Sequence, residues 1–217
     1  GEDTFLGSKI AVARVNGFQG KNLYDLNTVL ACTKHFAGYA LAQAGRDYNS
    51  VEISDRFLRD YILPPFKATV DAGAGSVMTS CSGIGGVPST ASKYLYDDIL
   101  RKEWNFKGFV VTDYTAIQEL IPHGVAKDLE EATLKSVDAG IEMDMMSGAF
   151  LNHLAKLVKD GKVKEEVINT AVRRILEAKY DLGLFEDPYR YSDAKREKET
   201  VMKKEFLDDA RDVARKS

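Results

Sequence analysis

An aspartate that directly follows a short apolar run is the side chain best placed to do chemistry in this 217-residue chain. Phe109-Val110-Val111 has the β-branched and aromatic character of a strand, and Thr112-Asp113-Tyr114 comes straight after it. In β/α barrels the C-terminal ends of the strands present the catalytic side chains. Asp113 in such a position could serve as a nucleophile, a general base or a metal ligand.

A second chemically capable pair is Lys34-His35, which follows Thr33 at the end of another apolar run. Adjacent side chains of an extended strand point to opposite faces, so both can reach one ligand only if the strand ends there. A lysine at a strand end also has a different use, because a desolvated amine of lowered pKa can form a Schiff base with a carbonyl substrate. The residues alone therefore leave open a lyase or aldolase that uses Lys34.

The remaining polar groups near strand ends are less specific. Glu142 and Asp144 belong to a further run with strand character, and Asp47 is either a second carboxylate on the same rim or the partner of Arg46 in a surface salt bridge. The segment 80–88 is rich in Gly and Ser, but it matches neither the GxGxxG nor the P-loop pattern. We therefore expect a tight turn there rather than a phosphate site.

Histidine and cysteine usage gives no metal-binding pattern. His35, His123 and His153 have no spacing suited to a shared ion, and we interpret the last two as a loop residue and a solvent-facing helix residue. Cys32 and Cys81 lack CxxC spacing and stand in apolar stretches, which predicts two buried small side chains. The sequence thus predicts neither a metal nor a cofactor.

Composition narrows the class of protein further. Lys and Arg number 30 against 33 Asp and Glu, for a net charge of -3, which is no electrostatic footprint for nucleic acid. No apolar run approaches the roughly 20 residues of a membrane span, and the first residues lack a signal-peptide pattern. The chain opens abruptly, so if it is a fragment, any targeting segment would lie upstream. The sequence predicts neither a nucleic acid nor a membrane as a partner.

The elements that must position these residues alternate between strand and helix. Helical stripes with apolar spacing separate the strand-like runs, Ser54 and Ser92 are candidate caps, and Pro64-Pro65 should kink or restart its helix. This alternation predicts βαβ units, a parallel sheet and an α/β fold. The strand-like runs are 29–34, 76–80, 109–113 and 141–144.

After Met146 the pattern becomes helical. We expect helices over 149–159 and 165–182, with Gly161 and Gly183 at their ends. The segment 192–217 is charged, but apolar residues recur in it at helical spacing, which predicts a final amphipathic helix with a solvated charged face.

Taken together, the motifs resemble glycoside hydrolase family 3, and most closely its bacterial β-glucosidases. The resemblance runs in order along nearly the whole chain. The matching segments are Gly1-Glu2-Asp3, Lys34-His35-Phe36-Ala37-Gly38, Ser76-Val77-Met78, Gly86-Val87-Pro88, Gly108-Phe109-Val110-Val111-Thr112-Asp113, Gly140-Ile141-Glu142-Met143-Asp144-Met145 and Lys179-Tyr180-Asp181-Leu182-Gly183-Leu184-Phe185.

The resemblance implies a retaining β-glycosidase on a (β/α)₈ TIM-barrel-like domain, acting on an oligosaccharide or β-glucoside. Asp113 matches the nucleophile, and Lys34 and His35 match the pair that binds sugar hydroxyls. Met78 and Tyr114 are further candidates for contacts with the sugar, although Met78 is more simply a core residue.

The resemblance also implies that parts of the active site lie elsewhere. Retention needs two carboxyl groups about 5–5.5 Å apart, and in this family the acid/base is usually a Glu of a following α/β sandwich domain. We therefore interpret residues 1–191 as a partial barrel that lacks its first strands, and 192–217 as a charged linker or helix leading towards that absent domain. Such a chain would be inactive alone, and its unpaired strand edges could pair with another copy. A periplasmic or secreted location would fit the full-length bacterial protein.

Three positions depart from the family pattern. Thr112 replaces the commoner Ser, Tyr114 stands where plant members have Trp, and Cys81 occupies a position often given to Tyr. Tyr39 after Gly38 also breaks the KHFPGHG motif of the family's N-acetylglucosaminidases, which disfavours that branch. A non-catalytic carbohydrate-binding fragment remains an alternative to an enzyme.

Overall fold

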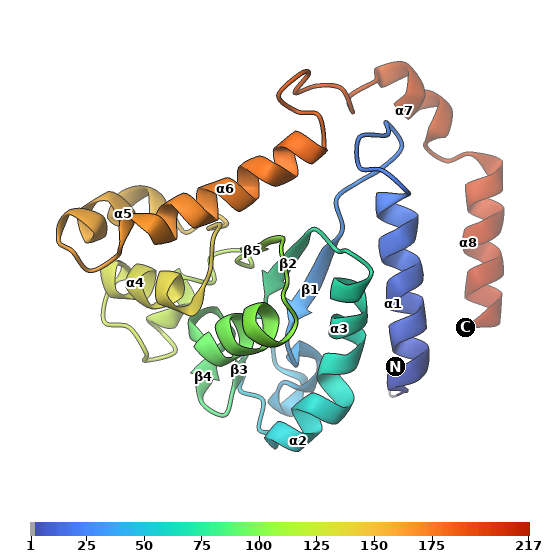
Figure 1. Cartoon of the computed structure of the whole chain (residues 1–217). Coiled ribbons are helices and arrows are strands. Elements are labelled where there is room, and N and C mark those ends of the chain that lie inside the picture. The colour runs from blue at the N-terminus through green and yellow to red at the C-terminus, as the bar shows by residue number, and fades with distance from the viewer. Residues whose placement is uncertain (1–2) are drawn as a thin grey trace. The chain divides into compact units, whose positions relative to one another are not determined.

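A computed structural model describes residues 3–217, so Gly1 and Glu2 of the first matching motif lie outside the described residues. Three parallel strands form its main sheet in the order β1-β2-β5, shown at the centre of Figure 1. The strands are β1 (Cys32–Phe36), β2 (Ser76–Thr79) and β5 (Phe109–Val111). Their parallel order brings the three C-terminal ends to one edge of the sheet, and Asp113 follows the last of them.

The strands predicted at 76–80 and 109–113 are present, although β2 ends at Thr79 and β5 at Val111, and the other two predictions need more correction. β1 begins at Cys32 rather than Val29, because the N–H of Ala31 donates to the Gln19 side chain, 3.0 Å away. The run 141–144 forms only an isolated bridge between Val111 and Met143. The reason is local: the N–H groups of residues 142 and 143 both donate to the carbonyl of Val110, each at 3.0 Å, so no regular ladder develops.

Helices cover the sheet on two sides. In Figure 1, α1 and α3 lie side by side near β1, whereas α4, α5 and α6 lie beyond β5. The helices of this part are α1 (Thr4–Gln19), α2 (Asp55–Phe57), α3 (Leu63–Asp71), α4 (Leu129–Ala139), α5 (Ala149–Lys159) and α6 (Glu165–Asp181), together with π-helical segments at Leu58–Ile62 and Tyr94–Glu103.

The local signals for helix starts are confirmed. The hydroxyl of Ser54 accepts from the N–H of Phe57 at 3.1 Å, and that of Ser92 accepts from Leu95 at 3.3 Å. α3 restarts at Leu63 with Pro64-Pro65 in its first turn, where no intrahelical N–H donor is needed.

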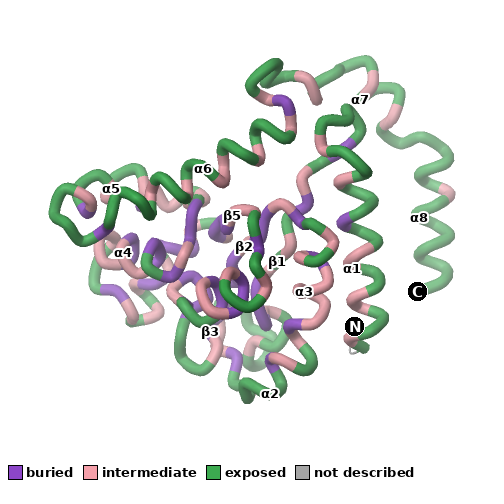
Figure 2. The backbone as a smooth tube through the Cα atoms, in the orientation of Figure 1, coloured by how far each residue is buried: buried purple, intermediate pink, exposed green. Residues whose placement is uncertain are grey.

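The main core lies between the sheet and the helices packed against it. Most of its fully buried side chains come from β1, β2, β5 and the π-helical segment Tyr94–Glu103, and Figure 2 shows buried backbone gathered there. They include Phe36, Val77, Val110, Tyr96, Ile99 and Leu100. This core fixes the strand ends from which the candidate site residues project.

The chain divides into two compact units at Leu182. The second unit, Gly183–Ser217, contains α7 (Ala194–Thr200) and α8 (Lys204–Lys216), and none of its residues from 184 onwards is buried. The predicted final helix is present as α8, with Phe206 on it about half exposed, but a break at 201–203 separates it from α7 and leaves Met202 outside it. No helix in the described part of the chain combines the length and the apolar character needed to cross a bilayer.

Candidate active site

Asp113 lies just beyond β5, and its carboxylate is contacted on both oxygens. Oδ1 accepts from the N–H of Tyr114 at 2.8 Å, while Oδ2 lies 3.4 Å from Nε2 of His35 and 3.4 Å from Sγ of Cys81. Its own N–H donates to the hydroxyl of Thr79 at the end of β2, 3.1 Å away. The side chain is 21% exposed, so the carboxylate is held in place yet open to a ligand.

His35 lies on β1 and contacts the carboxylate of Asp113, which follows β5. Its ring meets the ring of Tyr39 edge-on at 5.0 Å between centroids. Partial burial lowers the pKa of His35, and the charge of Asp113 opposes this effect only in part. A neutral imidazole is therefore favoured at neutral pH, with one nitrogen as donor and the other as acceptor.

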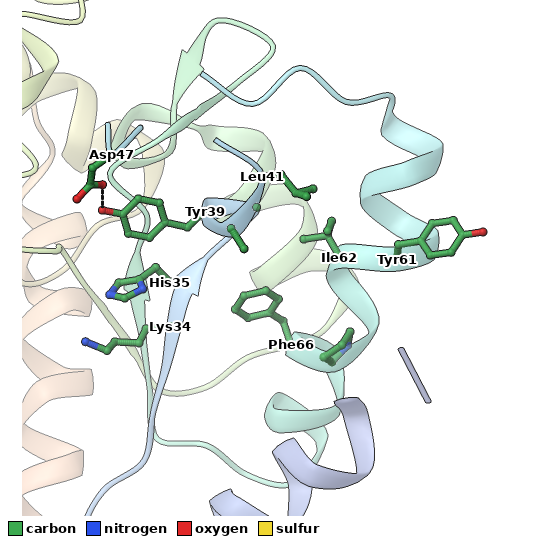
Figure 3. Close-up of a pocket in the computed structure, with 11 residues that line it drawn as sticks. Lys34, His35, Tyr39, Leu41, Asp47, Tyr61, Ile62 and Phe66 are labelled. Carbon is green, nitrogen blue, oxygen red and sulfur yellow. Dashed lines mark hydrogen bonds between the residues drawn. The ribbon is translucent and has the colours of Figure 1, made fainter. Parts of the chain in front are cut away.

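Lys34 and His35 line one cavity of about 630 Å³, although they are neighbours in sequence. Figure 3 shows both side chains pointing the same way from the end of β1, and an irregular register between Thr33 and Phe36 accompanies this arrangement. The expected strand end at this pair is not observed, because β1 runs on to Phe36, and the irregular register takes its place. The volume falls in the range of roughly 300–1,000 Å³ typical of small-molecule sites.

The rest of that cavity is part polar and part apolar. Tyr39 and Asp47 lie near His35 in Figure 3, where the Tyr39 hydroxyl donates to the Asp47 carboxylate. Burial, and then this hydrogen bond, raise the pKa of Tyr39, so the phenol stays protonated. Leu41, Ile62 and Phe66 form the apolar part.

The loop after β2 brings Cys81 to Asp113. It contains a short hairpin of β3 (Gly83–Ile84) and β4 (Val87–Pro88), which confirms the turn expected at Gly85-Gly86. Buried hydroxyl groups hold the base of this loop: Ser89 Oγ donates to the carbonyl of Phe36 at 2.7 Å and lies 2.6 Å from the hydroxyl of Tyr96. These bonds tie the loop to the end of β1, where His35 lies.

A carboxylate that the sequence reading did not single out lies beside this group. Glu119 follows the turn after Asp113, and its Oε1 accepts from the hydroxyl of Thr115 at 3.3 Å. Burial and the charge of Asp113 raise its pKa. With Tyr48, Pro122 and His123 it lines a second cavity of about 300 Å³. The only sequence feature that could have identified Glu119 is its six-residue spacing from Asp113, because six residues can form a turn that returns the chain to the same rim.

The structure places the other candidate residues in different surroundings. Met78 is half-buried in β2, and Tyr114 is 58% exposed, with its backbone rather than its ring on Asp113. Asp144 does not join the site, because its carboxylate accepts from the N–H groups of Ala149 and Phe150 at the start of α5. Asp47 bonds Tyr39 instead of the expected Arg46, because the loop brings the phenol to the carboxylate.

Glu142 is also locked away from any ligand. Its side chain is 6% exposed, accepts from the N–H of Val110 at 2.8 Å and pairs with Arg101 and Arg174. It therefore fastens β5 to α6 and has no free oxygen for acid or base chemistry.

Two further predictions need correction. Cys32 is exposed, not buried, because it stands on β1 at the edge of the sheet. His153 is half-buried rather than fully solvent-facing, since one side of α5 packs against α4. Among residues 3–217, no three His, Cys, Asp or Glu side chains are placed to hold a metal ion together.

Comparison with known proteins identifies the family. A model described as the N terminal domain of glycosyl hydrolase family 3 matches residues 1–178. The chain belongs to this family, whose N-terminal domain is a TIM-barrel-like α/β fold. The predicted resemblance and the TIM-barrel-like fold class are thereby confirmed.

Individual relatives agree with this assignment. The chain is 40% identical to a periplasmic β-glucosidase of Salmonella typhimurium, over 100% of this chain and 29% of that protein. It is 43% identical to a lysosomal β-glucosidase of Dictyostelium discoideum, over 87% and 24%. A crystal structure of a β-glucosidase from Listeria innocua with isofagomine matches with a TM-score of 0.90 and 40% identity, over 94% and 29%. The chain thus spans less than a third of the length of these relatives.

Proposed function

We propose that this chain supplies the nucleophile and part of the sugar-binding surface of a retaining β-glycosidase. The observation that carries the proposal is the position of Asp113, partly exposed at the rim of a parallel sheet with His35 at its carboxylate. Lys34 and His35 line a cavity of a size suited to a sugar; Asp113 does not line it, and His35 links the cavity to that carboxylate. Membership of the family supports the same assignment.

In the proposed reaction, the carboxylate of Asp113 attacks the anomeric carbon and the bond to the leaving oxygen breaks. The product is a covalent glycosyl-enzyme, which water then hydrolyses with net retention of configuration. Lys34 can donate to sugar hydroxyls, and neutral His35 can donate or accept. Two neighbouring side chains on one side of β1 would thereby bind different hydroxyls of one ring.

The second carboxyl group of this mechanism is proposed to lie outside the chain, on an α/β sandwich domain that follows the barrel. Within the described residues Glu142 is locked in ion pairs, and the Asp47 carboxylate binds Tyr39. We accordingly propose that 1–191 forms the greater part of a barrel that lacks its first strands, and that 192–217 leads to the next domain. That domain is then a partner of this surface.

The proposed substrate class is a terminal β-linked glucosyl or related residue. The Salmonella and Dictyostelium relatives are named β-glucosidases, while other relatives are named β-xylosidases. Glucose and xylose share the ring hydroxyls that Lys34 and His35 would bind, so these two residues do not distinguish the sugars.

Covalent trapping of the full-length protein tests the nucleophile. A 2-fluoro-β-glucoside with a dinitrophenyl leaving group needs no acid catalyst to depart, so it reports on the nucleophile alone. We expect the label on the peptide that contains Asp113, and a loss of labelling rate of roughly 10³-fold or more in Asp113→Ala. Asp138→Asn, at an exposed pair with Lys93, is the control and should label normally. Persistent labelling of another carboxylate in Asp113→Ala would overturn the proposal.

The lyase alternative has less support. A Schiff-base lysine needs a desolvated amine, and Lys34 is exposed. Borohydride trapping of a carbonyl compound at Lys34 would favour it. The carbohydrate-binding alternative predicts binding of a glucoside with no label on Asp113 in the full-length protein.

A further inference from the structure

Cys81 is the one thiol in contact with the proposed nucleophile among residues 3–217. Its Sγ lies 3.4 Å from Oδ2 of Asp113 and its side chain is 6% exposed. The distance is short for sulfur, and the geometry is that of an S–H group donating to a carboxylate oxygen. The contact is therefore a hydrogen bond and not only a packing contact.

The thiol is held there by the buried base of its loop. Ser80 Oγ and Ser82 Oγ lie 2.7 Å apart on either side of Cys81, and Ser82 N–H donates back to Ser80 Oγ at 3.2 Å. Both serines are fully buried. Cys81 is thus held against Asp113 by the buried turn formed by Ser80 and Ser82.

The surroundings keep this cysteine protonated. Burial raises the pKa of Cys81, and the negative charges of Asp113 and Glu119 raise it further. Only a weak opposing effect comes from the hydrogen bond with Tyr39. Cys81 therefore acts as a neutral hydrogen-bond donor and has no tendency to become a thiolate nucleophile.

The thiol of Cys81 has one proton to donate, and the carboxylates of Asp113 and Glu119 both interact with it. Oδ2 of Asp113 receives it, whereas Oε2 of Glu119 is buried and has no hydrogen-bond partner in the described part of the chain. The other titratable groups that interact with this cluster are Lys34 and His35 on β1 and, on the loop that follows it, Tyr39, Asp47 and Tyr48. The thiol thus makes its hydrogen bond to Asp113, while its interaction with Glu119 also acts on the pKa of that group.

We propose that Cys81 is a positioning residue that orients the carboxylate of Asp113 for attack by donating its S–H to Oδ2. With the Tyr114 N–H on Oδ1 and His35 also at Oδ2, rotation of the carboxylate would break at least one of these contacts. This inference rests on the proposed role of Asp113 as nucleophile, but the hydrogen bond itself does not.

The kinetic test uses the full-length protein and the same dinitrophenyl 2-fluoro-glucoside. We expect Cys81→Ala to lower the rate constant of glycosyl-enzyme formation about 10-fold, which is the effect of one hydrogen bond to a charged group, with little change in the concentration for half-maximal rate. Cys81→Ser should recover most of this rate, because its hydroxyl is again a donor. A purely packing role predicts the reverse order, since serine places a second polar group where alanine leaves only a small cavity. Cys32→Ala is the matched control, because Cys32 is exposed on β1 and should leave the rate unchanged.

An infrared measurement tests the bond without reference to activity. The S–H stretch lies in a region free of other protein bands, and the band that disappears in Cys81→Ala is that of Cys81. We expect this band at lower frequency than that of a free thiol, and a shift upwards in Asp113→Ala. A band at the free-thiol position in the wild type would overturn the inference. If the band shifts as expected but Asp113 takes no label, the proposed function fails and the hydrogen bond stands. If Asp113 is labelled but Cys81→Ala and Cys81→Ser form the glycosyl-enzyme at the same rate, the positioning role fails.

Discussion

Asp113 and Glu119 are two carboxylates on one rim, and they differ in the donors around them. Asp113 receives the N–H of Tyr114 and the thiol of Cys81, whereas Glu119 receives the hydroxyl of Thr115 on Oε1 and keeps a buried Oε2. Donors favour the charged form of a carboxyl group, and burial beside a like charge disfavours it. Glu119 is accordingly the group of this cluster that holds a proton more readily than an ordinary glutamate.

This difference predicts how stability depends on pH. The pKa of Glu119 is raised in the folded state, so its contribution to stability is full below about pH 4.5, the ordinary value, and is lost as the pH rises through the folded pKa. Glu119→Gln cannot ionise, so the difference in melting temperature between Glu119→Gln and the wild type should become more positive from pH 4 to neutral pH. Thermal unfolding followed by circular dichroism measures it.

Glu130 provides the control with the opposite sign. The ammonium groups of Lys156 and Lys162 lower its pKa, so its contribution is present above pH 4.5 and is lost as the pH falls. The difference for Glu130→Gln should therefore become more negative towards neutral pH. Parallel curves for both variants would contradict the assigned environments.

At the scale of elements, the starts of β2 and β5 approach each other more closely than side chains allow. A Cβ on Gly108 would lie 2.1 Å from the carbonyl oxygen of Gly75 and 2.7 Å from the ring of Phe106. Gln19 at the end of α1 completes this junction, because its Oε1 accepts from the N–H groups of both Ala31 and Gly75 at 3.0 Å. Backbone contact at this junction sets the register that carries Asp113 to the rim.

Gly108→Ala should therefore destabilise the chain by about 1–3 kcal/mol or more, because a backbone carbonyl cannot move aside as a flexible side chain can. Gly17→Ala is the matched control. Gly17 lies inside α1 with open space around its Cβ position, so alanine should stabilise by roughly 0.5–1 kcal/mol. Urea unfolding midpoints give both values, and equal effects of the two substitutions would refute the close contact.

At the scale of the whole molecule, the chain holds only part of the proposed catalytic machinery. It spans 29% of the length of the Salmonella relative, and β1 stands at an edge of the three-stranded sheet. Such an edge can pair with another segment of the same protein or with a second copy. Self-association of the chain alone stays a prediction, which sedimentation analysis can check.

The chain by itself should show no measurable turnover of an alkyl β-glucoside, because a poor leaving group needs a proton from an acid that we place outside it. The test measures the rate of glucose release by the chain alone and by the full-length protein, both at the same concentration. Turnover by the chain alone would place the acid within it, and Glu119→Gln would then be the first variant to examine.

The sequence by itself determined the local elements and the family. Pro64-Pro65 predicted the restart of α3, Ser54 predicted the cap of α2, and the run 109–113 predicted the strand β5 that Asp113 follows, because each of these depends on neighbouring residues only. Motifs in a fixed order then predicted the family resemblance and the TIM-barrel-like fold.

Tertiary structure alone decided which polar side chains meet. Glu142 and Asp47 looked equally available in sequence, yet one is fastened to Arg101 and Arg174 and the other binds Tyr39. Cys81 looked like an ordinary small core residue, and its contact with Asp113 joins positions 32 residues apart. Such contacts depend on how a loop returns to the rim of the sheet, and that return is set by packing between distant segments rather than by the residues of the loop.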